Sequence, residues 1–208
     1  MNKMSDMWDS RYAEAEYAYG TAPNKFLQDT INKYVLTGRI LFPAEGEGRN
    51  AVYAATQGMD VTAFDLSIEG KKKALKLADK KGVSMTYEIG QLPELELVTQ
   101  KFDVAALIYA HFLPPILSVY HKKIASLIEV GGLVILEGFS KGHLPLREAN
   151  PAVGGPGKLE MLFSVDSIQS DFLDFEIIQL EEVEVELEEG LYHNGVGKVI
   201  RFIGRKKG

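Results

Sequence analysis

The chain has 208 residues, 46% of them hydrophobic, and no linker-like stretch divides it, so we expect a single domain over residues 1–208. Its net charge of -6, from 29 acidic and 23 basic residues, argues against a nucleic-acid partner and favours a small-molecule substrate. The complete absence of Cys excludes disulfides, thiolate metal sites and a cysteine nucleophile, and we expect no metal site.

No apolar run approaches the roughly 18 residues of a membrane helix, and residues 1–6 lack the apolar centre of a signal peptide. We therefore expect a cytoplasmic protein with no membrane partner. The sequence leaves the oligomeric state open.

Apolar runs bounded by turn residues predict strands over residues 39–43, 60–65, 83–88, 102–109 and 132–137. Helical periodicity predicts helices over 49–57, 67–81 and 115–129, with Ser67 as an N-cap and glycines just past the helix ends. Strands that alternate with helices form a parallel sheet covered on both faces. Two more strands, over 174–187 and 196–204, are too close in sequence to hold a helix between them, so they should pair antiparallel.

The turn after the first strand contains Gly46 and Gly48, where missing Cβ atoms allow a ligand to approach the backbone. Asp65 ends the second strand nineteen residues after Gly46, and this spacing suits a carboxylate that accepts hydrogen bonds from ribose hydroxyls. The pattern predicts a nucleotide-cofactor site. It also satisfies the glycine spacing of a dinucleotide-binding turn, so the motif alone leaves the cofactor open.

Six segments occur in a fixed order along the chain: MWDSRY (7–12), YGTAPNKFL (19–27), AEGEGRNA (44–51), VTAFDLS (61–67), VGGLVILEG (130–138) and YHNG (192–195). Together they resemble the class I S-adenosylmethionine (SAM)-dependent methyltransferases, and most of all the tellurite-resistance and thiopurine-methyltransferase-like group. The resemblance implies an α/β fold with a doubly wound, mostly parallel seven-stranded sheet of order 3-2-1-4-5-7-6, an antiparallel C-terminal hairpin, and helices on both faces. It also implies SAM as the cofactor and residues 1–37 as a helical cover.

By this resemblance the cofactor-binding residues are Ala44, Glu45, Gly46, Gly48, Asp65, Leu66, Ser67, Gln91, Leu92 and Tyr109. Relatives commonly carry an acid two positions before the first glycine, and often Gly-Cys within the turn; in this chain those places hold Phe42, Ala44 and Glu45. Backbone groups or another acid must then hold the methionine amino group. Relatives often carry a second acid near Gln91, and a Gln amide can both accept from the adenine amino group and donate to a ring nitrogen.

His111 follows the fourth strand, at the position that the resemblance places beside the transferred methyl, and is the candidate catalytic residue. It either orients or deprotonates the acceptor, or it serves only in packing. The candidate substrate-binding residues are Tyr19, Asn24, Arg11 and His193. Two of these have other interpretations: Arg11 could pair with the cofactor carboxylate or lie in solvent, and His193 could be a structural turn residue.

The predicted function is methyl transfer from SAM to a small-molecule acceptor, for example a thiol or a tellurium or selenium oxyanion. A general base is needed only if the acceptor starts protonated. Residues 138–164 form a long polar stretch that we expect to be a substrate lid loop at the carboxyl edge of the sheet, with simple disorder as the alternative. Two alternatives stay open: a noncatalytic SAM-binding sensor or interaction module, and an NAD-dependent oxidoreductase, which the terminal hairpin disfavours.

Overall fold

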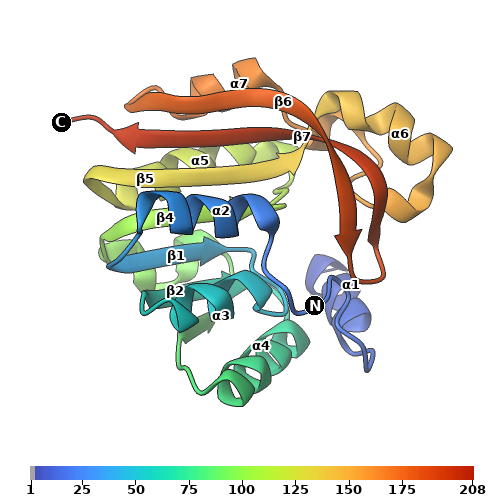
Figure 1. Ribbon diagram of the computed structural model, residues 1–208, viewed down its shortest axis with the longest axis horizontal. Coiled ribbons are helices and arrows are strands. Elements are labelled where there is room, and N and C mark those ends of the chain that lie inside the picture. The colour runs from blue at the N-terminus through green and yellow to red at the C-terminus, as the bar shows by residue number, and fades with distance from the viewer. Residues whose placement is uncertain (1–2) are drawn as a thin grey trace.

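A computed structural model describes residues 3–208, and within that range seven strands form one sheet of order β3-β2-β1-β4-β5-β7-β6 (Figure 1). The strands are β1 (Arg39–Pro43), β2 (Asp60–Asp65), β3 (Thr86–Ile89), β4 (Phe102–Ile108), β5 (Ile128–Phe139), β6 (Phe175–Glu189) and β7 (His193–Lys206). The first five are parallel, and β7 is antiparallel to both β5 and β6. The predicted class, strand order and terminal hairpin are therefore confirmed.

The bounds of β3 to β7 differ from the sequence prediction by one to four residues, and the starts of β3 and β5 have a clear reason. Strand β3 begins at Thr86 rather than residue 83, because the amide of Val83 still bonds to Ala78 O at the end of the preceding helix. Strand β5 begins at Ile128, directly after its helix ends at Leu127, whereas the sequence predicted helix up to residue 129 and strand only from 132. Pairing with β4 shifts register between Phe102 and Val104, which accommodates the early start.

The helices are α1 (Lys3–Tyr12), α2 (Lys25–Tyr34), α3 (Arg49–Thr56), α4 (Ile68–Lys81), α5 (Pro114–Leu127), α6 (Leu144–Ala149) and α7 (Val165–Asp171). Ser67 caps α4 by accepting from the amide of Gly70, and Gly82 ends it in the left-handed conformation. Both features agree with the prediction. In Figure 1, α2, α3 and α4 cover one face of the sheet, while α5 and α7 cover the other.

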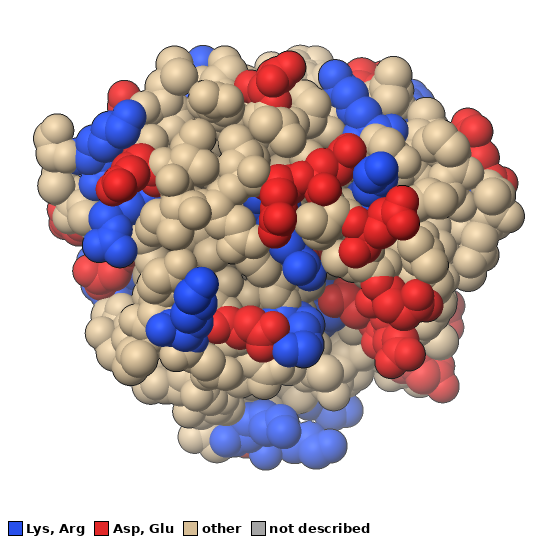
Figure 2. Space-filling view, turned by 45° about the horizontal axis from the view of Figure 1, so that its top comes forward, with Lys and Arg blue, Asp and Glu red and all other residues tan. Residues whose placement is uncertain are grey.

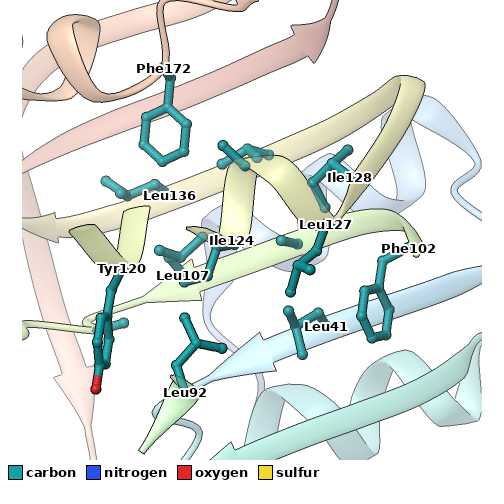
Figure 3. Packing of buried hydrophobic residues seen from close by; sticks show 14 of the residues in the cluster. Leu41, Leu92, Phe102, Leu107, Tyr120, Ile124, Leu127, Ile128, Leu136 and Phe172 are labelled. Carbon is teal, nitrogen blue, oxygen red and sulfur yellow. The ribbon is translucent and has the colours of Figure 1, made fainter. Parts of the chain in front are cut away.

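The sheet separates two apolar cores. One lies beneath α5 and α7, where Leu107, Ile124 and Phe172 are fully buried (Figure 3). The other lies beneath α2 and α3, around Leu27 and Phe42. Burial of each such side chain stabilises the fold by roughly 1.5 to 3 kcal/mol. The two cores hold the sheet rigidly and fix the positions of its carboxyl-end loops.

The long β6–β7 hairpin extends past the edge of the sheet and reaches the N-terminal segment that contains α1 (Figure 1). At its tip the amide of Leu191 donates to Ala18 O at 2.8 Å, and Gly190 has a left-handed φ of 64°. The amide of Ala18 in turn donates to Glu47 Oε2 at 2.7 Å. The N-terminal segment is thus tied both to the hairpin and to the turn before α3.

Residues 138 and 139 end β5, and the rest of the stretch to residue 164 contains a series of short helices: η3 (Lys141–His143), α6, η4 (Pro151–Val153) and η5 (Leu159–Met161). Local residues favour one of these short helices: Pro151 begins η4, and the side chain of Asn150 caps it by accepting from the amide of Ala152. No helix within residues 3–208 is long and apolar enough to cross a membrane.

Candidate functional site

A cavity of about 400 Å³ opens at the carboxyl ends of β1, β2 and β4. This is the edge at which open α/β sheets bind ligands, and the volume falls within the roughly 300 to 1,000 Å³ of small-molecule sites. Helix α1 closes one side, and the start of β7 together with residues 155–161 closes the other. Predicted site residues that line it are Arg11, Tyr19, Ala44, Glu45, Asp65, Leu66, Gln91, Tyr109, His111 and His193.

Asp65 lies at the end of β2 with both carboxylate oxygens bound to backbone amides. Its Oδ2 accepts from Gly46 at 3.0 Å, and its Oδ1 accepts from Ser67 at 2.9 Å. Burial raises the pKa of Asp65 to about 6, against the lowering effect of these amides. Each oxygen has a further lone pair, so the carboxylate can still accept from ligand hydroxyls.

Glu45 supplies a carboxylate in the turn after β1. Its Oε1 accepts from the amides of Asn50 and Ala51 at 2.9 and 2.8 Å, which satisfies two free N–H groups at the start of α3. Burial raises the pKa of Glu45 to about 7. Phe42 stands near the place where relatives carry an acid, but it is fully buried in the sheet. Glu45, in contrast, lines the cavity. This side chain is therefore the acid available for a cationic amino group.

Gly46 and Gly48 do not line the cavity, and their missing Cβ atoms make room for other parts of the chain. A Cβ on Gly46, whose φ is 63°, would lie 2.6 Å from the hydroxyl of Tyr12. A Cβ on Gly48 would lie 2.5 Å from the Cβ of Ala74 in α4. The space that these glycines leave is thus filled by the protein itself, which brings α1 and α4 against the turn.

Of the remaining predicted cofactor residues, some line the cavity and others lie behind its wall. Gln91 follows β3, lines the cavity and accepts from the hydroxyl of Tyr120 at 3.5 Å. Ser67 lies outside the cavity as the cap of α4, and its hydroxyl donates to Asp9 at 2.5 Å. Leu92 also lies outside, fully buried in the core.

The other end of the cavity is aromatic. The ring of His193 lies 4.5 Å from that of Tyr19 and 4.7 Å from that of Tyr109, and Phe139 lies 4.8 Å from Tyr109. Tyr109 has a left-handed φ of 54°, and its hydroxyl donates to Glu137 Oε1 at 3.2 Å. Such a backbone conformation is costly for a residue other than Gly and directs this ring into the site.

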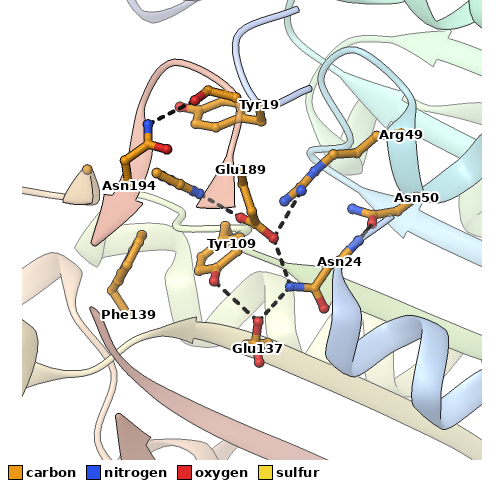
Figure 4. A network of polar contacts seen from close by, with 12 residues as sticks. Tyr19, Asn24, Arg49, Asn50, Tyr109, Glu137, Phe139, Glu189 and Asn194 are labelled. Atoms are coloured by element: carbon orange, nitrogen blue, oxygen red, sulfur yellow. Dashed lines mark hydrogen bonds and ion pairs between the residues drawn. The ribbon is translucent and has the colours of Figure 1, made fainter. Parts of the chain in front are cut away.

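A network of polar groups supports the aromatic end (Figure 4). Asn24 does not line the cavity: its amide donates to Glu137 at 2.6 Å and to Glu189 at 3.3 Å, and its oxygen caps α2. Arg49 forms an ion pair with Glu189 at 3.0 Å, and Arg201 donates to Glu137 at 2.6 Å. The two buried carboxylates are thus paired with cations, as burial requires.

His111 has no free ring nitrogen. Its Nδ1 donates to Met161 O at 2.9 Å, and its Nε2 accepts from the amide of Phe139 at 3.0 Å. Burial lowers the pKa of His111 to about 4, so the ring is neutral near pH 7. The side chain connects the end of β5 to residues 138–164 and forms part of the cavity wall.

Arg11 reaches the cavity from α1. Its guanidinium lies 5.1 Å from the ring centre of Trp8 and 4.6 Å from that of Tyr192, and its Nη1 donates to the hydroxyl of Tyr19 at 2.8 Å. It has no carboxylate within ion-pair distance in the described chain. Arg11 is therefore a cation available to an anionic group in the cavity.

Sequence reasoning did not find Glu137, Glu189 or Arg49. One signal was present: Glu189 and His193 stand four residues apart across a tight hairpin turn, which places them opposite each other. The contacts of Arg49 and Glu137 join segments that are far apart in the chain, so no local sequence pattern predicts these contacts.

The sheet order, the terminal hairpin and a cavity at the carboxyl ends define the fold of the class I SAM-dependent methyltransferases. Residues 40–132 match the family described as a methyltransferase domain. None of the curated proteins matches the chain.

Solved structures share this fold at low sequence identity. The chain reported for the conversion of a disulfide bond into a thioacetal group during echinomycin biosynthesis is 18% identical, with a TM-score of 0.77 over 98% of this chain and 92% of that chain. TehB from Haemophilus influenzae is 17% identical, with a TM-score of 0.71 over 98% of this chain and 67% of that one. Magnesium protoporphyrin IX methyltransferase (ChlM) from Synechocystis PCC 6803 with bound SAH is 16% identical, with a TM-score of 0.65 over 97% and 93%.

The methyltransferase-domain match over part of the chain and the shared fold support methyl transfer with SAM as the cofactor. The residues present fit this cofactor. Glu45 and Asp65 provide two carboxylates on one cavity wall, and the cavity continues beyond them into an aromatic end.

Proposed function

We propose that this protein is a SAM-dependent methyltransferase that acts on a small-molecule acceptor. The observation that carries the proposal is one continuous cavity with two carboxylates at one end and an enclosed aromatic wall at the other. Such a division suits a charged cofactor beside an apolar or aromatic acceptor.

In this proposal Asp65 accepts from the ribose hydroxyls, Glu45 holds the methionine amino group and Gln91 lies beside the adenine. Ala44, Leu66 and Tyr109 contribute backbone groups and walls, while Gly46, Gly48, Ser67 and Leu92 shape the turns behind them. When bound, SAM supplies an electrophilic methyl group. The protein then contributes mainly alignment, which in favourable cases corresponds to roughly 7 to 11 kcal/mol of the barrier.

A sulfur nucleophile is the acceptor that we test first. The aromatic rings of Tyr19, Tyr109 and Phe139 favour a soft, polarisable group, and the cavity has only one cation without a carboxylate partner in the described chain, Arg11. The likeness to TehB keeps a tellurium or selenium oxyanion as the second acceptor to test. An oxyanion would need Arg11 as its counter-ion.

Residues 1–37 and 138–164 act as the covers of this site in the proposal. The first contributes Trp8, Arg11 and Tyr19 from around α1, and the second contributes Pro156 and Met161. Ligand exchange then requires at least one of them to move. Residues 1 and 2 of the first cover lie outside the described range.

The face drawn in Figure 2 also favours a small acceptor over nucleic acid. On the face drawn in Figure 2, acidic groups are interspersed with basic ones and no broad basic area is present. Binding to a phosphate backbone needs a concentration of Lys and Arg.

The test is calorimetric titration with SAM, its demethylated product S-adenosylhomocysteine (SAH) and NADH. We expect micromolar binding of SAM and SAH and none of NADH, followed by SAH production in a screen of thiols and chalcogen oxyanions. Binding of NADH alone would refute the proposal. Tight SAM binding without turnover of any acceptor would favour the noncatalytic sensor.

A further inference from the structure

His193 is held by a carboxylate at the aromatic end of the cavity. It is the first residue of β7 and pairs in register with Glu189, the last residue of β6. Its Nδ1 lies 2.9 Å from Glu189 Oε2, and the residue is only 5% exposed. The hairpin therefore fixes the ring in one orientation.

Glu189 is fixed in turn by groups from two other parts of the chain. Its Oε1 lies 3.0 Å from Arg49 Nη1 and 3.3 Å from the amide nitrogen of Asn24. Burial alone would raise the pKa of Glu189, but the hydrogen bond from His193 and the charge of Arg49 outweigh it and lower the pKa to about 2. Glu189 is thus an ionised, acceptor-only group at neutral pH, so the proton of a neutral His193 must be on Nδ1.

The other ring nitrogen of His193 is then a free base. Nε2 makes no hydrogen bond with residues 3–208, and it is not one of the fully enclosed atoms that lack a partner. The ring lines the cavity between Tyr19 and Tyr109. An imidazole that lines a ligand site, with one ring nitrogen unbonded and a carboxylate held by the other, has the arrangement of a general base.

None of the other three histidines has this arrangement. Both nitrogens of His111 are bound to backbone groups, and the same is true of His143, which bonds to Gly154 O and the amide of Lys198. His121 is paired with Asp171 at 2.7 Å, but neither residue lines the cavity. His193 is the one histidine placed to accept a proton from a bound acceptor.

We propose that His193 is the general base of this site, that Glu189 orients it, and that the acceptor carries a proton on its nucleophilic atom at neutral pH, as an alkyl thiol does. This inference rests on the proposed methyltransferase function. The acceptor gives its proton to Nε2, and its freed electron pair forms the bond to the methyl carbon. The bond from that carbon to the sulfonium sulfur breaks, and its electron pair stays on the sulfur, which becomes neutral.

The charged and titratable groups around His193 come from several elements. Glu189 on β6 favours the protonated ring, while Arg49 on α3 and Arg11 on α1 oppose it; Tyr19 and Tyr109 are neutral at pH 7. Burial has the largest effect and lowers the pKa of His193 below its ordinary value. The ring is accordingly neutral and ready to accept a proton at pH 7.

The first test needs no acceptor. Nitrogen-15 NMR of histidine-labelled protein, with His193 assigned from the His193→Asn spectrum, reports which ring nitrogen carries the proton. We expect Nδ1–H and an unprotonated Nε2 at pH 7, with or without SAH. A ring protonated on Nε2 at pH 7 overturns the assignment, whereas failure of SAH to bind would count against the proposed function alone.

The second test uses the thiol that is turned over in the acceptor screen. In His193→Asn the new amide can still donate to Glu189, so the hairpin keeps its pairing while the base is lost. We expect kcat/KM at pH 7 to fall about 100-fold or more, within the range of general-base effects, with SAH affinity within threefold. The deficit should shrink as pH rises toward the pKa of the thiol itself, because an ionised acceptor needs no base.

The matched control is His121→Asn, which alters the other buried histidine–carboxylate pair of the described chain, His121 with Asp171, neither of which lines the cavity. It should lower thermal stability without changing the pH profile of turnover. A His193→Asn deficit that stays constant with pH, or a deficit no larger than that of the control, would leave His193 a structural residue and sink the proposal.

Discussion

Asp65 serves the fold and the site at once. Both of its oxygens accept backbone amides at the ends of β1 and β2, so replacement by Asn leaves one N–H without an acceptor. A buried unpaired donor costs roughly 1 to 3 kcal/mol. We expect Asp65→Asn to lower the thermal midpoint and to weaken SAH binding at least tenfold. Asp60→Asn, at the exposed start of the same strand, is the control, and unchanged SAH affinity in Asp65→Asn would contradict the ribose assignment.

Glu45 links cofactor binding to proton release. Its pKa of about 7 in the ligand-free protein means that it is partly protonated near neutral pH. A cationic amino group placed beside it lowers that pKa, so SAM binding near pH 7 should release protons. Calorimetry in two buffers of different ionisation enthalpy measures this number. We expect SAM binding to release fewer protons in Glu45→Gln than in the wild type. The same number of protons in both proteins would show that Glu45 does not contact the cofactor.

At the scale of elements, the hairpin tip and the N-terminal segment form one cover over the cavity. Gly190 allows their close approach, because a Cβ there would lie 2.4 Å from the backbone nitrogen of Gly20. We expect Gly190→Ala to separate the two segments, to speed amide exchange in α1 and to weaken SAH binding. Hydrogen exchange and calorimetry provide the measurements.

Gly58→Ala is the control for backbone strain. Gly58 has a φ of 84°, equally unfavourable for Ala, but nothing lies within 4 Å of the added Cβ. The Gly58→Ala variant should lose stability to an extent similar to Gly190→Ala, while its SAH affinity should equal that of the wild type. Equal SAH affinity in both variants would show that the tip contact does not matter for binding.

Elements with strong local signals could be predicted from the sequence. Strands β1 and β2 match their predicted bounds, and α4 ends where Lys81 meets Gly82, because apolar periodicity and capping residues are local properties. The junction of α5 and β5 was misplaced because apolar residues at 127, 128 and 130 fit either structure. The short helices within 138–164 were missed, since their stability depends on contacts with β7 rather than on their own pattern.

For the molecule as a whole, stability should depend on pH in two opposing ways. The pKa of His111 falls to about 4 from an ordinary 6.5, and burial lowers the pKa of His143 and His193 too, so the unfolded chain binds more protons and stability rises as pH rises to about 6.5. Glu45 and Asp65, with pKa values raised to about 7 and 6, act in the opposite sense. Above pH 6.5 mainly Glu45 still titrates, and stability should then fall slightly.

Urea unfolding of the ligand-free protein between pH 5 and pH 8 measures this profile. We expect a maximum near pH 6.5 in the wild type and no decline above it in Glu45→Gln. A wild-type profile that keeps rising to pH 8 would show that Glu45 is already ionised in the folded protein.

Only those residues of the candidate site that lie at the carboxyl ends of strands could be predicted from the sequence. Asp65 ends β2, and Glu45 and Tyr109 follow β1 and β4 within two residues; the fold brings such positions to one edge of the sheet. Glu137 was not predictable because its partners, Asn24 and Arg201, lie on other elements and only folding brings them together.

The contact between Asn24 and Glu189 joins residues 165 positions apart in the chain. Contacts of such separation form late, since the entropy of closing a long loop must be overcome before they are made. The carboxylate end of the cavity uses contacts of much shorter range, such as the 19-residue separation of Gly46 and Asp65. The acceptor end of the cavity therefore depends on closing a much longer loop of chain than the cofactor end does.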